Sequence, residues 1–211
     1  MKQYIVAKEG WIFLFFLLII TLVVYTLADW WCLLPGILFF FVVYFFRNPK
    51  RSVPDDNGVI VAPADGVVKQ VEIVTESRFL NEEAIKVSIF LSLFNVHINR
   101  APVEGTVEYV EKVGGRFIPA YRKEASDLNA RNFVGLATRW GKILVVQITG
   151  LIARRIVCWS SVGDMVETGE RFGLIRFGSC TELYLPRNVE VMIKPGDRVK
   201  GGLSVLGRFT D

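Results

Sequence analysis

The chain has few side chains capable of acid–base or nucleophilic chemistry near neutral pH. Its 211 residues include one histidine, His97, within the segment FNVHINRAP (residues 94–102). A lone imidazole among apolar residues is more often structural than catalytic, yet any histidine-dependent chemistry must use His97. One histidine and three scattered cysteines cannot form a zinc site of the usual kind, so we predict no metal. The cysteines provide no disulfide framework either.

Two turn-like segments carry the other candidate residues. Asp65 lies in the segment APADG (62–66), where an acidic residue most often serves the turn itself. Ser179 follows Gly178 near the end of GERFGLIRFGSC (169–180), and a Gly-Ser pair taken alone usually marks a bend. Several arginines could also attract anionic head groups beside a bilayer. They are Arg131, Arg139, Arg154, Arg155 and Arg176.

A β-rich domain must position these residues, because residues 59–211 consist of short strand-like runs separated by turn residues. Near the C-terminus, residues 162–169 (VGDMVETG) and 195–202 (PGDRVKGG) share the pattern G-D-x-V-x-x-G. Such turns are typical of compact sandwiches related to biotinyl and lipoyl carriers. We therefore predict a mainly β, compact, sandwich-like domain with biotinyl/lipoyl-like hairpins over 59–211, after a polar linker at 47–58. Residues 119–132 are expected to form a loop or a short helix.

The N-terminal region is a different kind of sequence. Only five of the 36 residues from 11 to 46 are not apolar, and about 20 apolar residues suffice for a helix to cross a bilayer core. We predict a membrane anchor at 1–46, a transmembrane hairpin of helices at about 11–28 and 30–46 that reverses at Asp29. A hairpin that only dips into one leaflet is the alternative, since each helix is just long enough. Basic residues flank the apolar block and place both ends in the cytoplasm: Lys2, Lys8, Arg47, Lys50 and Arg51.

Taken together, these segments resemble one known family. PADG (63–66), FNVHINRAP (94–102), GRFIPAYRKEASDLNAR (115–131) and the block from QITGLIARRIV to YLP (147–186) are similar to phosphatidylserine decarboxylases of the shorter, archaeal and bacterial branch. The similarity extends over about residues 47–205, and GERFGLIRFGS followed by YLP is its most specific part.

The resemblance implies a pyruvoyl enzyme that cleaves its own chain. The bond between Gly178 and Ser179 would be cut, and the resulting chains, 1–178 and 179–211, would stay associated. Ser179 would become the pyruvoyl group, a covalent cofactor at the new N-terminus. The same resemblance makes His97 the base in this reaction.

The implied reaction is the decarboxylation of phosphatidylserine held in the membrane. Asp65 is implied as the acid that orients His97, so that Ser179, His97 and Asp65 are the catalytic residues. The pyruvoyl ketone would form a Schiff base with the substrate amine and accept electrons as CO2 leaves, and hydrolysis would release phosphatidylethanolamine. The hairpin would hold the catalytic domain at the cell (inner) membrane, on its cytoplasmic side, where a net charge of +4 favours an anionic leaflet.

Two positions depart from the family pattern. The longer bacterial branch has a second histidine three residues before the position of His97, where this chain has Phe94, so no role of that histidine can be carried over. After Ser179 the family often has Thr or Arg, whereas this chain has Cys180, which we expect to be a bystander thiol.

Three other functions compete with this hypothesis. Decarboxylation of archaetidylserine uses the same head group on ether lipids, so the sequence does not separate the two substrates. A membrane-anchored, non-enzymatic adaptor built on a biotinyl/lipoyl-like sandwich explains the anchor and the repeat, but it would not be cleaved at Gly178. A membrane-anchored metallopeptidase is disfavoured by the single histidine. No nucleic-acid partner is expected, and the sequence leaves open whether the protein is a homo-oligomer.

Overall fold

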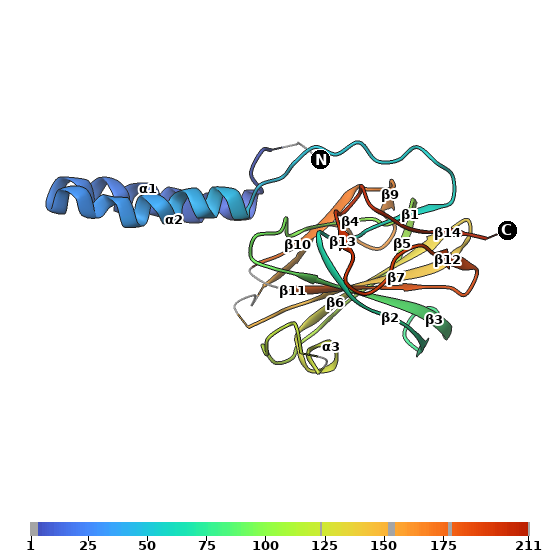
Figure 1. Ribbon diagram of the computed structural model, residues 1–211. Coiled ribbons are helices and arrows are strands. Elements are labelled where there is room, and N and C mark those ends of the chain that lie inside the picture. The colour runs from blue at the N-terminus through green and yellow to red at the C-terminus, as the bar shows by residue number, and fades with distance from the viewer. Residues whose placement is uncertain (1–3, 123, 152–154, 177–178, 211) are drawn as a thin grey trace. The chain divides into compact units, whose positions relative to one another are not determined.

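The computed structural model describes residues 4–122, 124–151, 155–176 and 179–210. The chain consists of two compact units, Met1–Lys50 and Arg51–Asp211. The first unit is helical and the second is rich in β-strands (Figure 1).

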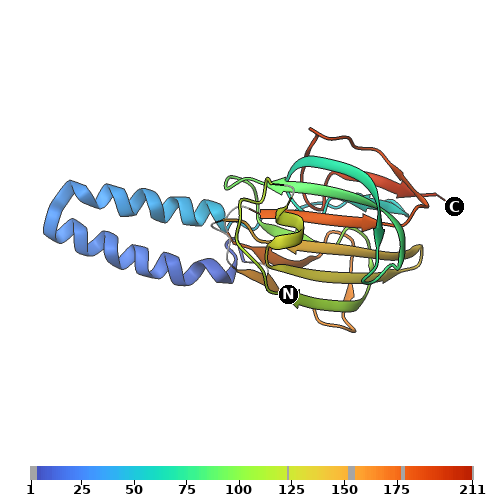
Figure 2. The same ribbon diagram turned by 90° about the horizontal axis from the view of Figure 1, so that it is seen from below.

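The N-terminal unit is a pair of antiparallel helices joined by a tight reversal (Figure 2). The chain reverses at Asp29, whose φ of 46° lies in the left-handed region. At the other end of the hairpin, the Ala7 N–H donates a hydrogen bond to the Phe46 carbonyl at 2.8 Å. The elements are α1 (Lys8–Ala28), the 3-10 turn η1 (Asp29–Cys32) and α2 (Leu33–Phe45).

The helical stretch Lys8–Phe45 is long and apolar enough to cross a membrane, which confirms the apolar helical segment predicted there. Its two halves differ in length. With a rise of about 1.5 Å per residue, α1 is about 31 Å long and α2 about 20 Å, against a bilayer core of about 30 Å. The helix predicted at 30–46 begins at Leu33, because η1 occupies the residues before it. Whether the hairpin spans the bilayer or enters one leaflet stays a prediction.

The described residues of the β-rich unit form fourteen strands in three antiparallel sheets. The largest sheet has eight strands in the order β13-β2-β3-β11-β7-β6-β5-β9, and the smaller ones have the orders β1-β14-β12 and β4-β10-β8. One buried apolar core takes residues from all three sheets, including Ile60, Val87 and Phe172. The mainly β fold class predicted from the short alternating runs is therefore confirmed.

The strands have the following bounds: β1 (Val59–Val61), β2 (Gly66–Glu76), β3 (Glu82–Leu91), β4 (Ile98–Arg100), β5 (Gly105–Val113), β6 (Arg131–Thr138), β7 (Gly141–Ile148), β8 (Ile156–Cys158), β9 (Met165–Val166), β10 (Arg171–Ile175), β11 (Ser179–Leu185), β12 (Val189–Val191), β13 (Arg198–Val199) and β14 (Val205–Phe209). A short helix, α3 (Ala125–Leu128), lies between β5 and β6, within the region expected to be a loop or short helix.

The G-D-x-V-x-x-G pattern supplies the two edge strands of the large sheet, β9 and β13. Its first glycines, Gly163 and Gly196, have φ values of 95° and 99°, and its last glycines, Gly169 and Gly202, have φ values of 75° and 74°. These values lie in the region that glycine adopts without steric cost. The two repeats therefore share one backbone conformation.

Each G-D repeat packs against a second repeated segment with the pattern A-P-x-(D/E)-G. In both cases the last glycine of the G-D repeat donates its N–H to the alanine carbonyl of that segment at 2.8 Å. The first copy of this combined repeat consists of residues 62–66 and 196–202, and the second of residues 101–105 and 163–169. Asp65 in the first copy corresponds to Glu104 in the second.

Candidate active site

One end of the eight-stranded sheet gathers the candidate residues. A continuous row of paired residues crosses six strands near this end: Val67, Phe90, Cys180, Ile148, Arg131 and Val113. Asp65 immediately precedes β2, and Ser179 begins β11, so both lie just beyond this row. We call this end of the sheet the site end.

Ser179 is fully buried and pairs with Leu91 of β3. Among the residues that the structure describes, its Oγ has no hydrogen-bond partner. Leaving a buried hydroxyl unpaired costs about 1–3 kcal/mol, so such a group requires an explanation, and a catalytic role is one. Gly178, the other residue of the predicted cleavage site, lies outside the described residues.

His97 is also fully buried, and a backbone carbonyl orients its ring. Its Nδ1 lies 3.0 Å from the Asn95 carbonyl oxygen, which can only accept a hydrogen bond, so Nδ1 carries the proton. The neutral ring then has Nε2 as its basic atom. The Ile175 N–H donates to the His97 carbonyl at 3.1 Å, which places His97 beside the end of β10, four residues before Ser179 in the sequence.

Buried amide hydrogen bonds connect the segment of His97 with that of Ser179. Asn99 Nδ2 donates to Thr181 Oγ1 at 2.9 Å, and Gln147 Nε2 donates to Asn99 Oδ1 at 2.8 Å. Alternate residues of an extended chain share a face, so His97 lies on the face that carries Asn99, and Ser179 on the face that carries Thr181. The structure thus brings these two segments together in one buried polar region.

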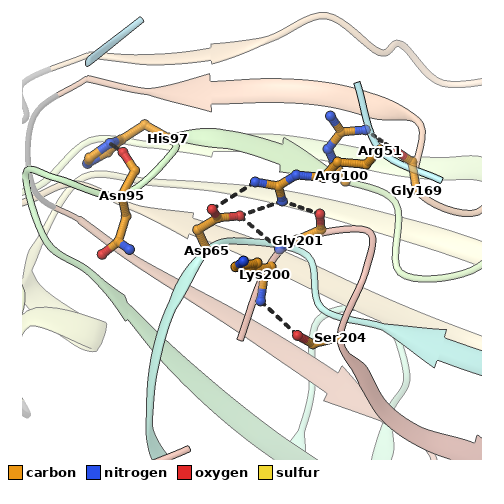
Figure 3. A network of polar contacts seen from close by, with 9 residues as sticks. All are labelled: Arg51, Asp65, Asn95, His97, Arg100, Gly169, Lys200, Gly201 and Ser204. Carbon is orange, nitrogen blue, oxygen red and sulfur yellow. Dashed lines mark hydrogen bonds and ion pairs between the residues drawn. The ribbon is translucent and has the colours of Figure 1, made fainter. Parts of the chain in front are cut away.

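Asp65 is buried at the same end of the sheet, but its hydrogen bonds go to other groups. Its carboxylate accepts from Arg51 Nη1 at 2.5 Å and from Nη2 at 2.8 Å, and from the Gly201 N–H at 2.8 Å (Figure 3). Arg51 Nη1 also donates to the Gly201 carbonyl. No hydrogen bond joins Asp65 to His97 among the described residues, so its orienting role stays a prediction.

Two further arginines lie near this ion pair. Arg100 is 4% exposed and donates from Nη1 to the Gly169 carbonyl at 2.8 Å. Burial, together with the neighbouring Arg171 and Arg51, lowers the pKa of the Arg100 guanidinium to about 10. Burial and Arg51 also lower the pKa of Arg171. The sequence predicts neither Arg51 nor Arg100 as a site residue, because no local pattern distinguishes them from solvated arginines.

Residues 38–207 of the chain match the family described as phosphatidylserine decarboxylase. The chain belongs to that family. A relative from Carboxydothermus hydrogenoformans is 50% identical over 211 residues, 99% of each chain. A relative from Symbiobacterium thermophilum is 49% identical over 99% of this chain and 98% of its own, and one from Syntrophus aciditrophicus is 42% identical over 97% of each. All three are named phosphatidylserine decarboxylase proenzyme.

The structure places both departures from the phosphatidylserine decarboxylase pattern at the site end. Phe94 is 66% exposed in the loop after β3. Cys180 is buried, and burial raises the pKa of its thiol well above the ordinary value, with a smaller contribution from Glu182. A thiol that stays protonated is a poor nucleophile, and the bystander role of Cys180 stays a prediction.

The remaining predicted groups lie at different places. Arg155 is exposed at the site end, whereas Arg139 lies beyond the end of β6, at the opposite end of the sheet. Arg154 lies outside the described residues. Over the described part of the chain, no group of three or more His, Cys, Asp or Glu side chains is arranged to hold a metal ion.

Proposed function

We propose that this chain is a phosphatidylserine decarboxylase proenzyme that cleaves itself before Ser179 and carries a pyruvoyl group at that position. The buried Ser179 hydroxyl, without a partner among the described residues, supports this proposal most directly. The similarity to proteins named proenzymes supports it independently. A pyruvoyl group fits the position, since it would replace the serine side chain and leave no buried hydroxyl unpaired.

In the proposed self-cleavage, His97 Nε2 takes the proton of Ser179 Oγ. The oxygen attacks the carbonyl carbon of Gly178, the C–N bond breaks, and the nitrogen takes a proton, so that an ester replaces the amide. Removal of the Cα proton of residue 179 then breaks the Cβ–Oγ bond and leaves a Gly178 carboxylate and a dehydroalanine. Water replaces the nitrogen of this dehydroalanine, ammonia leaves, and a pyruvoyl group remains on residue 179.

In the proposed decarboxylation, the pyruvoyl group supplies a ketone that accepts the electrons released when the substrate carboxylate leaves as CO2. The role of this chain's own residues is to place and protonate the substrate. His97, no longer needed for cleavage, donates a proton to the carbon that has lost CO2. The product is phosphatidylethanolamine.

Asp65 is proposed to support His97 by its charge. Its bonds to Arg51 and Gly201 hold the carboxylate in one place at the site end. A fixed negative charge favours the imidazolium that forms when His97 takes up the serine proton.

The two products of cleavage are proposed to remain together. β11 begins at Ser179 and is hydrogen-bonded to β3 on one side and β7 on the other. A strand in the middle of a sheet keeps these bonds when the peptide bond before it is cut. The apolar stretch Lys8–Phe45 supports attachment to the cell membrane, with the catalytic domain on the cytoplasmic side.

The decisive experiment is an intact-mass measurement on the purified full chain. We expect two polypeptides, 1–178 and 179–211, the smaller one blocked to Edman degradation because its N-terminus is a ketone. Ser179→Ala should give one uncleaved chain without activity, whereas Ser52→Ala, at an exposed position, should be cleaved normally. The wild type should release CO2 from phosphatidylserine. A single 23.9 kDa species in active protein would exclude the pyruvoyl assignment.

A further inference from the structure

Four segments leave the large sheet at the site end. One follows β3, one connects β5 with β6, one follows β7 and one precedes β11. Their described residues are 92–97, 114–122, 124–130, 149–151, 155 and 176. They therefore border the same end of the sheet as Ser179 and Asp65.

These segments expose large apolar side chains. Phe94 and Tyr121 are each 66% exposed, Leu151 is 55% exposed and Phe117 is 36% exposed. We call these four residues the apolar rim. Every exposed aromatic side chain that the structure describes in Arg51–Asp211 belongs to it. Trp and Tyr are enriched where a protein meets the head-group region of a bilayer, and Phe and Leu are common on the apolar faces of helices that lie in that region.

The same segments are positively charged, unlike the rest of the β-rich unit. By sequence, the four segments contain six Lys or Arg and two Asp or Glu, whereas the remaining residues of 51–211 contain fifteen and seventeen. Arg116, Arg122 and Arg155 are exposed there, beside the apolar rim. This combination of exposed aromatic and basic side chains matches an anionic lipid surface.

We propose that the apolar rim docks on an anionic phospholipid bilayer. Docking places the entrance to the site against the lipid head groups, so that a lipid substrate reaches Ser179 without leaving the membrane. The part of this inference that concerns the substrate rests on the proposed function, whereas the docking itself does not.

Hydrogen–deuterium exchange on the full chain tests the docking without any turnover. We compare protein in detergent with protein in vesicles of phosphatidylcholine and phosphatidylglycerol. Amides of 92–97 and 114–122 should exchange at least about 10-fold more slowly in the vesicles, because a docked loop opens less often. The turns at 77–81 and 139–140, at the opposite end of the sheet, should not change.

Matched variants locate the surface. The double variant Phe94→Ser/Tyr121→Ser should lose the protection, whereas Ile73→Ser/Met192→Ser, at positions 57% and 60% exposed elsewhere, should keep it. Vesicles of phosphatidylcholine alone should give weaker protection, since the arginines then face no net charge. Equal exchange in detergent and vesicles would overturn the proposal. So would protection in detergent that rises with protein concentration, which would indicate a second copy of the chain.

Activity measurements separate this inference from the proposed function. Phe94→Ser/Tyr121→Ser should reduce the turnover of vesicle-borne phosphatidylserine about 10-fold and leave that of a water-soluble, short-chain phosphatidylserine unchanged. Equal loss on both substrates would contradict a docking role. If the wild type acts on neither substrate, the proposed function fails, and the exchange experiment still decides whether the rim docks.

Discussion

The two copies of the internal repeat share a backbone conformation but place their acidic residues in different surroundings. In the first copy, Asp65 is buried and held by Arg51 and Gly201. In the second copy, the Glu104 side chain is 57% exposed, and its ion pair with Arg139 is 3.8 Å long. The A-P-x-(D/E)-G turn alone therefore does not make a site.

The register of the large sheet explains the difference. β2 starts at the site end, beside the row that contains Phe90 and Cys180. β5 starts at the opposite end, where Thr106 pairs with Ala137. One turn thus lies at the same end of the sheet as the buried serine and the other lies at the opposite end, so the neighbours supplied by the rest of the chain distinguish them.

The largest difference between the copies is expected in self-cleavage. Asp65→Asn keeps the size of the side chain but removes a charge that favours the His97 imidazolium, and it should slow cleavage by at least about 10-fold. Glu104→Gln, the corresponding change in the second copy, should have no effect. The measurement is the fraction of cleaved chain against time after cell-free synthesis. Equal rates for the two variants would remove Asp65 from the proposed mechanism.

The ion pairs should differ in their contribution to stability. Arg51 and Asp65 have side chains only 6% and 10% exposed, so Arg51→Met leaves a buried carboxylate and should cost about 3–5 kcal/mol of unfolding free energy. Arg139→Met breaks an exposed pair and should cost at most about 0.5 kcal/mol. Urea unfolding in detergent, in the uncleaved Ser179→Ala background, measures both. Similar losses would show that burial does not distinguish the two pairs.

Alanine substitutions of the two glycines that follow the acidic residues, Gly66 and Gly105, should lower the stability of the protein by similar amounts. A Cβ on Gly66 would lie 2.2 Å from the Phe90 carbonyl oxygen, and one on Gly105 would lie 2.6 Å from that of Ala137. Each Gly→Ala change should therefore cost about 2–3 kcal/mol, because the strands must separate. Gly114→Ala is the control, since nothing lies within 4 Å of its Cβ. Melting temperatures in the same background give the comparison, and a tolerated Gly66→Ala would contradict the tight packing at the start of β2.

The smallest changes in unfolding free energy are expected from alanine substitutions of the first glycines of the G-D repeats. Gly163 and Gly196 have open space around a Cβ, so Gly→Ala costs only the strain of a positive φ, about 1–2 kcal/mol at each position. The same urea titrations measure these two variants. A cost at one position but not at the other would show that the two repeats differ in backbone after all.

Composition and alternation were sufficient to predict the mainly β unit and the apolar helical stretch. The strand runs alternate clearly, and the apolar block of 11–46 is nearly uninterrupted. The start of α2 was placed too early, because the aromatic pair at Trp30 and Trp31 is as apolar as the helix but forms the 3-10 turn.

The contacts of the site were far harder to predict. Asp65 takes one hydrogen bond from Gly201, 136 residues later in the chain, and no spacing rule connects them. The ring of His97 is oriented by the Asn95 carbonyl, a backbone group that has no sequence signal. In the sequence, nothing distinguishes Gln147 and Asn99 from other polar residues of strands. Only the folded sheets bring their side-chain amides into hydrogen-bond contact.

One hydrogen-bond partner of Asp65, the Gly201 N–H, is synthesised long after Asp65, and this order has a consequence for biosynthesis. Gly201 is made 136 residues after Asp65, and β13, which lies just before Gly201, pairs with β2 near the start of the domain. During synthesis on the ribosome, the carboxylate of Asp65 cannot reach its final surroundings until the C-terminal residues have emerged. The proposed self-cleavage should therefore wait until residues 198–201 have been made and have folded against β2.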